Sequence, residues 1–206
     1  MTCYVIGGSE MNRMRMRLSA VSALIMLTIA LSCFGQSKAA TPQANPVVLL
    51  ETSMGNIKVE LFENKAPVTT KNFLTYVNAG FYNGTIVHRV DFVVGLGGYT
   101  EALMAKSALP PIKNESKNGL KNLRGTLAMA RYDNPDSATS QFFINLKNNS
   151  HLDPAGSESG YAVFGKVIGG MDVVDKIAGV KTGSKGQFSN IPLQTILVKS
   201  AIIAAK

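Results

Sequence analysis

The sequence predicts a mainly β domain between residues 47 and 206, either a closed barrel or a two-sheet sandwich. Many short runs rich in Val, Ile, Leu and Phe follow one another there, and turns rich in glycine or asparagine separate them. Only two stretches show the three- and four-residue spacing of apolar side chains that an amphipathic helix needs. Short strands joined by tight turns, with few helices, are typical of barrels and sandwiches.

The segment before this domain predicts export. Arg13, Arg15 and Arg17 precede an uncharged apolar run, Leu18–Leu31, and small residues follow at Ala39 and Ala40. This order is that of a secretory signal peptide. We expect residues 1–39 to be a signal peptide that is cleaved near Ala39 or Ala40, and residues 40–46 to be a linker.

Two other interpretations of the leader remain open. A retained membrane anchor would need about 20 apolar residues, and this run is shorter even when it is extended to Phe34. A lipoprotein would be acylated at Cys33, which ends the apolar run. In that signal Leu usually stands three residues before the cysteine, whereas this chain has Ala30.

The first elements of the domain are a hairpin and a helix. Val47–Glu51 is β-branched and apolar, and Ile57–Leu61 alternates strictly between apolar and polar residues, so we expect two strands around the turn at 54–56. Residues 66–80 predict a helix, since Pro67 suits its first turn and Gly80 its end.

The remaining elements are short. A second helix is expected at Met171–Ile177, before Gly179. Six further strands are expected from β-branched and aromatic runs: Ile86–Val90, Phe92–Leu96, Thr126–Ala130, Phe142–Asn145, Ala162–Ile168 and Thr195–Ala201.

Charge and cysteine content exclude several classes of protein. The 206 residues carry a net charge of +8, but the leader holds four basic residues and one acidic residue, so the mature chain carries +5. No block of like charge remains, and nucleic-acid binding therefore has little support. Both cysteines, Cys3 and Cys33, lie in the leader. We expect a mature domain without disulfides, stabilised by its core alone.

Reactive side chains are scarce in the mature chain. It contains two histidines, His88 and His151, and no cysteine. A nucleophile–base pair or a zinc site would need more partners than this. The glycine-rich run Gly95–Gly98 lacks the continuation of a phosphate-binding loop, and we interpret it as a tight strand turn. We expect no metal and no cofactor.

Five motifs in order carry a resemblance to a known family. They lie at residues 66–73, 81–90, 124–131, 140–145 and 160–167. With their spacing, they make the chain from about Val47 to about Ala201 similar to the cyclophilins, the β-barrel peptidyl-prolyl cis–trans isomerases. The segment Pro110–Glu115 and the leader resemble most the periplasmic cyclophilins of Gram-negative bacteria.

The resemblance implies an eight-stranded antiparallel β-barrel capped by two α-helices, with an active groove on its outer face. It implies Arg89, Gln141 and Phe143 as catalytic residues, Arg89 being the cation directed at the prolyl nitrogen. Phe143 would form the proline pocket with Phe92, Val93 and Leu152. Gln141 would bind the substrate backbone. The remaining groove residues that it implies are Ala130, Asn145, His151 and Tyr161.

The chain departs from the family pattern after Val90. The segment 91–96 is two residues shorter than usual, and Asp91 begins it. Gly95 stands where the family has a glutamine that holds the catalytic arginine. Asp91 either replaces this support or competes for the guanidinium. A second departure is His151, where many members have a bulky aromatic residue, and we therefore expect weak binding of cyclosporin.

The function that the sequence predicts is isomerisation of X–Pro bonds to assist protein folding in the cell envelope. The expected partners are proline-containing peptides and unfolded or folding envelope proteins. We expect a periplasmic monomer, with no membrane association after cleavage and no nucleic-acid partner. The alternative is a cyclophilin-fold binding module or chaperone with weak or no isomerase activity, which the shortened 91–96 loop favours.

Overall fold

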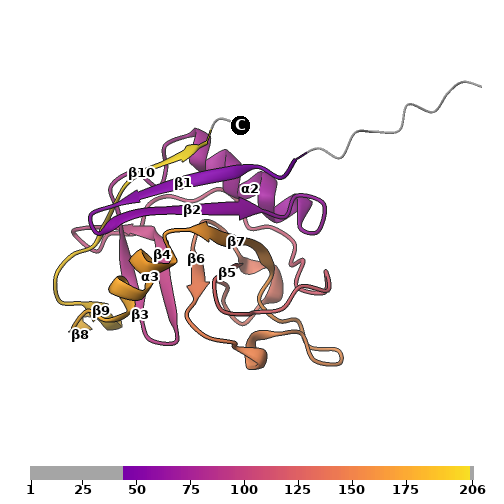
Figure 1. The fold of residues 1–206 in the computed structure, drawn as a ribbon. Helices are drawn as coiled ribbons and strands as arrows, with labels where there is room; N and C mark the ends of the chain where they lie inside the picture. Colours follow the sequence, from indigo (N-terminus) through magenta and orange to yellow (C-terminus); the bar gives the residue numbers. More distant parts are fainter. Residues whose placement is uncertain (1–43, 205–206) are drawn as a thin grey trace, which may run out of the picture. The chain divides into compact units, whose positions relative to one another are not determined.

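The computed structural model describes residues 44–204, which form a closed barrel of eight antiparallel strands (Figure 1). Around the barrel the strands follow the order β1, β10, β3, β4, β6, β5, β7, β2. The predicted β-rich fold is confirmed, and of its two forms the barrel is the correct one. The predicted signal peptide and its cleavage site lie outside the described residues.

The first two strands form the expected hairpin. Strand β1 (Val47–Thr52) pairs with β2 (Gly55–Leu61), and Leu50 lies opposite Ile57. Alternate side chains of β1, Val48 and Leu50, point into the barrel and have no exposed surface. This alternation arises because successive side chains of a strand point to opposite faces.

All six other predicted strands are present. They are β3 (Thr85–Val90), β4 (Val93–Thr100), β5 (Thr126–Met129), β6 (Phe142–Asn145), β7 (Val163–Gly169) and β10 (Leu197–Ile203). The interpretation of Gly95–Gly98 as a turn is wrong, because this run lies inside β4. At Gly98 a Cβ atom would lie 2.5 Å from Cγ of Gln141. Glycine therefore lets the side chain of Gln141 cross the strand.

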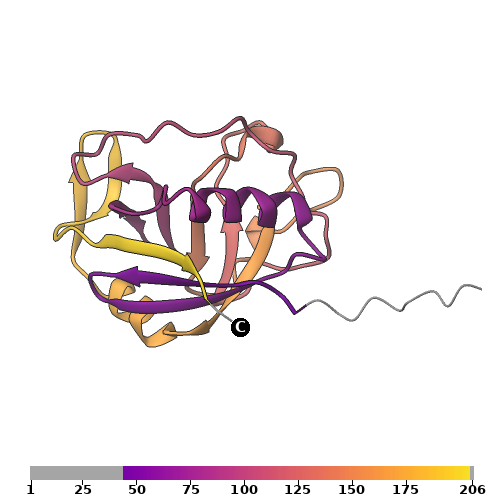
Figure 2. The same ribbon diagram turned by 90° about the horizontal axis from the view of Figure 1, so that it is seen from above.

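The two predicted helices are α2 (Pro67–Asn78) and α3 (Met171–Ala178). Seen from above, α2 lies across one opening of the barrel (Figure 2). Its Phe73 packs against the rings of Tyr82, Phe142 and Phe164, at centroid distances of 5.1–5.2 Å. This cluster of aromatic rings links α2 to the barrel interior.

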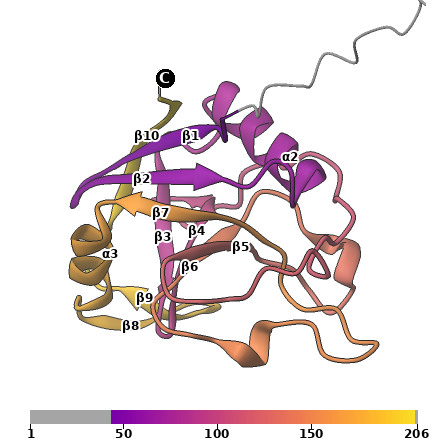
Figure 3. The same cartoon turned by 45° about the vertical axis from the view of Figure 1, so that its right-hand side comes forward.

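Helix α3 follows β7 and leads into a hairpin that the sequence did not predict (Figure 3). The hairpin consists of β8 (Thr182–Lys185) and β9 (Phe188–Pro192). Its Phe188 packs against Tyr99 of β4, with ring centroids 4.8 Å apart, and so attaches the hairpin to the barrel wall.

Two apolar clusters make up the core. The larger one includes Phe142 and Phe164 and fills the barrel. The smaller one contains Val93, Ala128, Phe143 and Val163. Phe142 and Phe143 are neighbours in β6 and belong to different clusters, as strand alternation requires. The smaller cluster therefore lies on the face of the strands that points away from the barrel interior.

Candidate active site

The site begins with a row of residues across four neighbouring strands. Arg89 of β3 pairs with Gly95 of β4, Gly95 pairs with Phe143 of β6, and Phe143 pairs with Ala128 of β5. Residues that lie opposite one another across strands share a face. With strands about 4.8 Å apart, the backbones of Arg89 and Phe143 are about 10 Å apart. Arg89 and the apolar cluster thus lie on one face.

The guanidinium of Arg89 is held from one edge. Its Nε donates to Oδ2 of Asp91 at 2.8 Å, and its Nη2 lies 2.7 Å from the same oxygen. Its Cζ lies 5.3 Å from the centroid of the Phe92 ring. About half of the Arg89 side chain is exposed. No hydrogen bond within residues 44–204 involves Nη1, so that nitrogen is available to a ligand.

Asp91 is itself fixed by the turn between β3 and β4. Its Oδ1 accepts from the backbone N–H of Val93 at 3.1 Å, and its own N–H donates to the Val93 carbonyl at 3.0 Å. The carboxylate therefore binds the turn through one oxygen and Arg89 through the other. Asp91 thus contacts the guanidinium directly, which both roles considered for it from the sequence require.

An apolar cluster adjoins Arg89 through Phe92. Partly buried side chains pack against the smaller core cluster from the loops and the turn. Tyr161 lies edge-on to Phe143, with ring centroids 5.6 Å apart. The structure brings together in this cluster six of the residues that the resemblance implied: Phe92, Val93, Ala130, Phe143, Leu152 and Tyr161.

His151 lies at the rim of this pocket. It belongs to the short 3₁₀ helix Ser150–Leu152, and its ring lies edge-on to that of Phe92, 5.3 Å between centroids. The side chain of His151 is exposed. It therefore contacts the pocket through Phe92, and its outer surface faces solvent.

Gln141 precedes β6 and is half-buried. Its carbonyl accepts from the N–H of Ala130 at 3.0 Å. No hydrogen bond in the described part of the chain uses its side-chain amide. Gln141 lines a pocket of about 110 Å³ whose other residues include Tyr99, Ala130, Arg131, Tyr132, Ser137 and Thr139. Its amide is thus available to pair with a peptide backbone.

Asn145 does not lie along the groove. Alternation places it on the same face as Phe143, but it has no exposed surface. Its Nδ2 donates to Oγ1 of Thr126 at 2.9 Å and to Oδ1 of Asn122 at 3.2 Å. Its Oδ1 accepts from Asn149 at 2.8 Å. The loops that carry Asn122 and Asn149 cover it, so Asn145 supports the site from beneath.

Two residues near the site were not among the site residues predicted from the sequence, Arg131 and Asp91. Cζ of Arg131 lies 4.8 Å from the ring centroid of Tyr161, and its guanidinium donates to the carbonyls of Ser159 and Gly160. Asp91 was noticed only as a departure from the family. The position of Arg131 directly after Ala130 was the signal that could have identified it.

His88 precedes Arg89 at an irregularity of the β3–β4 pairing, and its Nε2 lies close to Gly95 on the side of the sheet that carries Arg89. Its ring packs edge-on against Tyr99, 5.0 Å between centroids, and against Phe188 at 6.3 Å. Burial, and then the positive charge of Arg89, lower the pKa of His88 to about 4, against a smaller opposing effect of a backbone hydrogen bond with Ile86. The imidazole is therefore neutral at ordinary pH.

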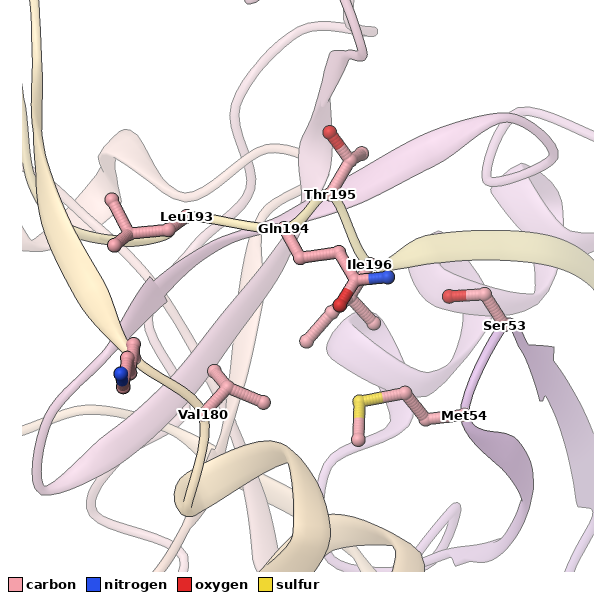
Figure 4. A pocket seen from close by; sticks show the side chains of 8 residues that line it. Ser53, Met54, Val180, Leu193, Gln194, Thr195 and Ile196 are labelled. Carbon is pink, nitrogen blue, oxygen red and sulfur yellow. The ribbon is translucent and has the colours of Figure 1, made fainter.

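A separate pocket of about 460 Å³ contains none of the predicted site residues (Figure 4). It is lined by the β1–β2 turn, by the end of the segment after α3, and by the segment before β10: Ser53, Met54, Val180, Lys181, Leu193, Gln194, Thr195 and Ile196. Among residues 44–204, no three His, Cys, Asp or Glu side chains gather in a way that could hold a metal ion. No helix in that range is long and apolar enough to cross a membrane.

Comparison with known proteins agrees with this geometry. The family model described as "Cyclophilin type peptidyl-prolyl cis-trans isomerase/CLD" matches residues 47–202. Peptidyl-prolyl cis-trans isomerase A of Dickeya dadantii is 50% identical over 188 residues, which cover 90% of this chain and 98% of the relative. Peptidyl-prolyl cis-trans isomerase B of Escherichia coli is 47% identical over 163 residues, or 77% of this chain and 99% of the relative.

A solved structure shows the same likeness. A Cryptosporidium parvum cyclophilin type isomerase, crystallised in the presence of the dipeptide Ala-Pro, superposes with a TM-score of 0.65 at 27% identity, covering 78% of this chain and 99% of that one. The resemblance seen in the sequence motifs is thereby confirmed. The chain belongs to the cyclophilin-type peptidyl-prolyl cis–trans isomerases.

Proposed function

We propose that this isomerase accelerates X–Pro bond rotation in proteins that fold in the cell envelope, with Arg89, Gln141 and Phe143 as its catalytic residues. The observation that carries the proposal is the row from Arg89 through Gly95 to Phe143, which places Arg89, held by Asp91, on the same face as the apolar cluster around Phe143. Gln141, two residues before Phe143, adds an amide with free hydrogen-bonding capacity in the pocket that it lines with Ala130.

The chemistry follows from the amide bond itself. An X–Pro bond rotates in tens to hundreds of seconds because its partial double bond must be twisted. In the twisted form the prolyl nitrogen becomes pyramidal and regains a lone pair. A positioned N–H donor that meets this lone pair stabilises the twisted form more than the planar one, which is what catalysis requires.

Each part of the site has a task in this scheme. The pocket around Phe143 holds the proline ring, and the amide of Gln141 binds the substrate backbone and so restricts which part rotates. Nη1 of Arg89, whose guanidinium is held at its opposite edge, donates to the prolyl nitrogen. Arginine suits this task because it stays charged and only donates hydrogen bonds.

The test of this assignment is Arg89→Ala, with Arg89→Lys beside it. We expect Arg89→Ala to lower kcat/KM for an Ala-Pro peptide by about a hundred-fold, while the circular dichroism spectrum stays unchanged because the side chain is half exposed. Arg89→Lys should recover little, since a lysine cannot reproduce the planar donor set. A wild-type rate for Arg89→Ala would overturn the assignment.

Export is the second part of the proposal. The match to the Dickeya relative covers 90% of this chain, so only about a tenth of the 206 residues lies outside it. Residues 1–46 are more than a tenth of the chain, and part of them must therefore lie within the match. Similarity to that isomerase therefore extends into the segment interpreted as a signal peptide. Together with the basic and apolar pattern of that segment, this supports export. The exported enzyme that we propose is a periplasmic monomer that acts on unfolded or folding envelope proteins.

Export is tested by expressing the full chain in a Gram-negative host. We expect the protein in the periplasmic fraction, with an intact mass that begins at or near Ala40, and as a monomer in gel filtration. The variant Cys33→Ala should leave the protein in the periplasmic fraction and should leave the mass of the mature chain unchanged. A full-length mass in the cytoplasm would contradict export, and loss of membrane-bound protein in Cys33→Ala would instead indicate a lipoprotein.

A further inference from the structure

The segment that departs most from the family pattern contains the contact that fixes Arg89. Between Arg89 and Phe143 the row is occupied by Gly95, which has no side chain. Position 95 of β4 therefore offers no side chain that could bind the guanidinium. The only carboxylate that contacts Arg89 within residues 44–204 comes from the turn, at Asp91.

We propose that Asp91 is the positioning residue of Arg89 and replaces, from the turn, the support that Gly95 cannot give. The proposal rests on the assignment of Arg89 as the catalytic cation. Asp91 acts through Arg89 and does not itself contact the substrate.

The geometry favours support over competition. Both contacts, from Nε and Nη2, go to the single oxygen Oδ2, on one edge of the guanidinium. The opposite edge, with Nη1, stays available. The ring of Phe92 lies 5.3 Å from Cζ and restricts the guanidinium from a second direction. A carboxylate that competed with the substrate would occupy the free edge instead.

The carboxylate is itself well placed to hold another group. Its side chain is only 19% exposed, against 48% for Arg89. The N–H of Val93 fixes Oδ1, and Val93 belongs to the apolar cluster around Phe143. The position of Arg89 is thus coupled through Asp91 to the proline pocket, by two successive hydrogen bonds.

The deciding variant is Asp91→Asn. The asparagine keeps an oxygen that accepts from the N–H of Val93, so the turn is preserved, but its NH₂ group cannot accept from Arg89. We expect kcat for an Ala-Pro peptide to fall about ten-fold, as for a lost hydrogen bond to a charged group. KM should stay within about two-fold, since the pocket is unchanged.

A double-variant cycle shows whether Asp91 acts through Arg89. In an Arg89→Ala background, Asp91→Asn should cause no further loss, because the group that it positions is absent. Equal losses in both backgrounds would overturn the proposal, as would an unchanged or increased kcat in Asp91→Asn alone. Asp172→Ala removes another exposed contact, Lys176 Nζ to Asp172 Oδ2 at 3.4 Å, and serves as the control without an effect.

Restoring a side chain at position 95 provides a gain-of-function test. Gly95 does not have the left-handed backbone that favours glycine, and a Cβ there would lie 3.3 Å from Cβ of Arg89 and 3.5 Å from Nε2 of His88, so a Cβ atom needs only a small shift of its neighbours. We expect Asp91→Asn/Gly95→Gln to regain most of the lost kcat. A folded double variant without any recovery would overturn the replacement of support by Asp91.

The two assignments fail in different ways. If Arg89→Ala retains the wild-type rate, the catalytic role of Arg89 is wrong and the role of Asp91 falls with it. If Arg89→Ala is inactive but Asp91→Asn is fully active, only the role of Asp91 is wrong. Circular dichroism and the unfolding midpoint show whether each variant is folded. A loss of folded protein is therefore not mistaken for a loss of activity.

Discussion

The ring of Tyr161 contacts both the ring of Phe143, at 5.6 Å between centroids, and the guanidinium of Arg131, whose Cζ lies 4.8 Å from the centroid. The contact with Phe143 is edge-on, and the guanidinium of Arg131 lies over the ring. No hydrogen bond of the hydroxyl occurs within residues 44–204. Tyr161 therefore builds the pocket through its ring.

This contact separates the role of the ring from that of the hydroxyl. Tyr161→Phe should keep kcat/KM for an Ala-Pro peptide within about two-fold. Tyr161→Ala should lower it about ten-fold, because an aromatic pair and the apolar surface around Phe143 are lost together. If Tyr161→Phe were as impaired as Tyr161→Ala, the hydroxyl would have to contact the substrate.

Arg131 should affect substrate binding more than turnover. Its guanidinium donates to the carbonyls of Ser159 and Gly160 and so fixes the loop before Tyr161. Arg131→Ala should raise KM several-fold with little change in kcat. Arg131→Lys should recover part of the loss, since a lysine keeps the charge without the planar set of donors.

The control for Arg131 is Arg124→Ala. Arg124 also makes close contacts through its guanidinium, here an ion pair with Asp175 of α3 at 2.8 Å, but it contacts none of the cluster residues named above. Its removal should leave both kinetic constants unchanged. Equal effects of the two variants would show that the loss is a general consequence of removing an arginine contact.

Local patterns predicted most of the barrel. Alternation separated Phe142 from Phe143, and Pro67 with Gly80 bounded the first helix, because these signals depend only on neighbouring residues. Strands β8 and β9 were missed because Thr182–Lys185 is polar and has no alternation. That hairpin is held by Phe188 against Tyr99, a contact between residues far apart in the sequence.

The sequence predicted which residues form the site better than it predicted how they are arranged. Residues implied by the motifs meet around Phe143, since strand register carries them together. The burial of Asn145 depends on loops that no periodicity describes. The contact of Asp91 with Arg89 depends on the conformation of one turn. Sequence could identify both possible roles of Asp91, and the proposal that it supports Arg89 rests on the positions of its two oxygens.

Asn145 should be important for stability and for the shape of the site. Its amide bonds with Thr126, Asn122 and Asn149, and Asn149 in turn donates to the carbonyl of Phe92 at 3.3 Å. Asn145→Ala leaves buried polar groups unpaired and should lower the free energy of unfolding by about 1–3 kcal/mol. Urea denaturation measures this change.

The matched control is Asn56→Ala, on an exposed position of β2. It should change the free energy of unfolding by less than about 0.5 kcal/mol. If Asn145→Ala were equally mild, the buried network would contribute nothing measurable. A folded Asn145→Ala protein should also have a raised KM, because the backbone at Phe92 loses its anchor.

His88 makes the stability of the fold depend on pH. In the folded protein burial and Arg89 lower its pKa from 6.5 to about 4. Between these values the unfolded chain binds a proton at His88 and the folded chain does not. The free energy of unfolding therefore falls as the pH decreases from about 6.5 to about 4, by up to about 3 kcal/mol for a shift of this size.

The variant His88→Gln isolates this contribution from that of the carboxylates, which titrate in the same range. Urea denaturation of both proteins between pH 4.5 and 8 should give parallel curves above pH 7. Below about pH 6.5 the wild type should lose stability faster than His88→Gln, because only the wild type must keep an imidazole neutral beside Arg89, Tyr99 and Phe188. Curves that stay parallel down to pH 4.5 would show that the folded protein accommodates a charged His88, and that its burial between β4 and the β8–β9 hairpin is not maintained in acid.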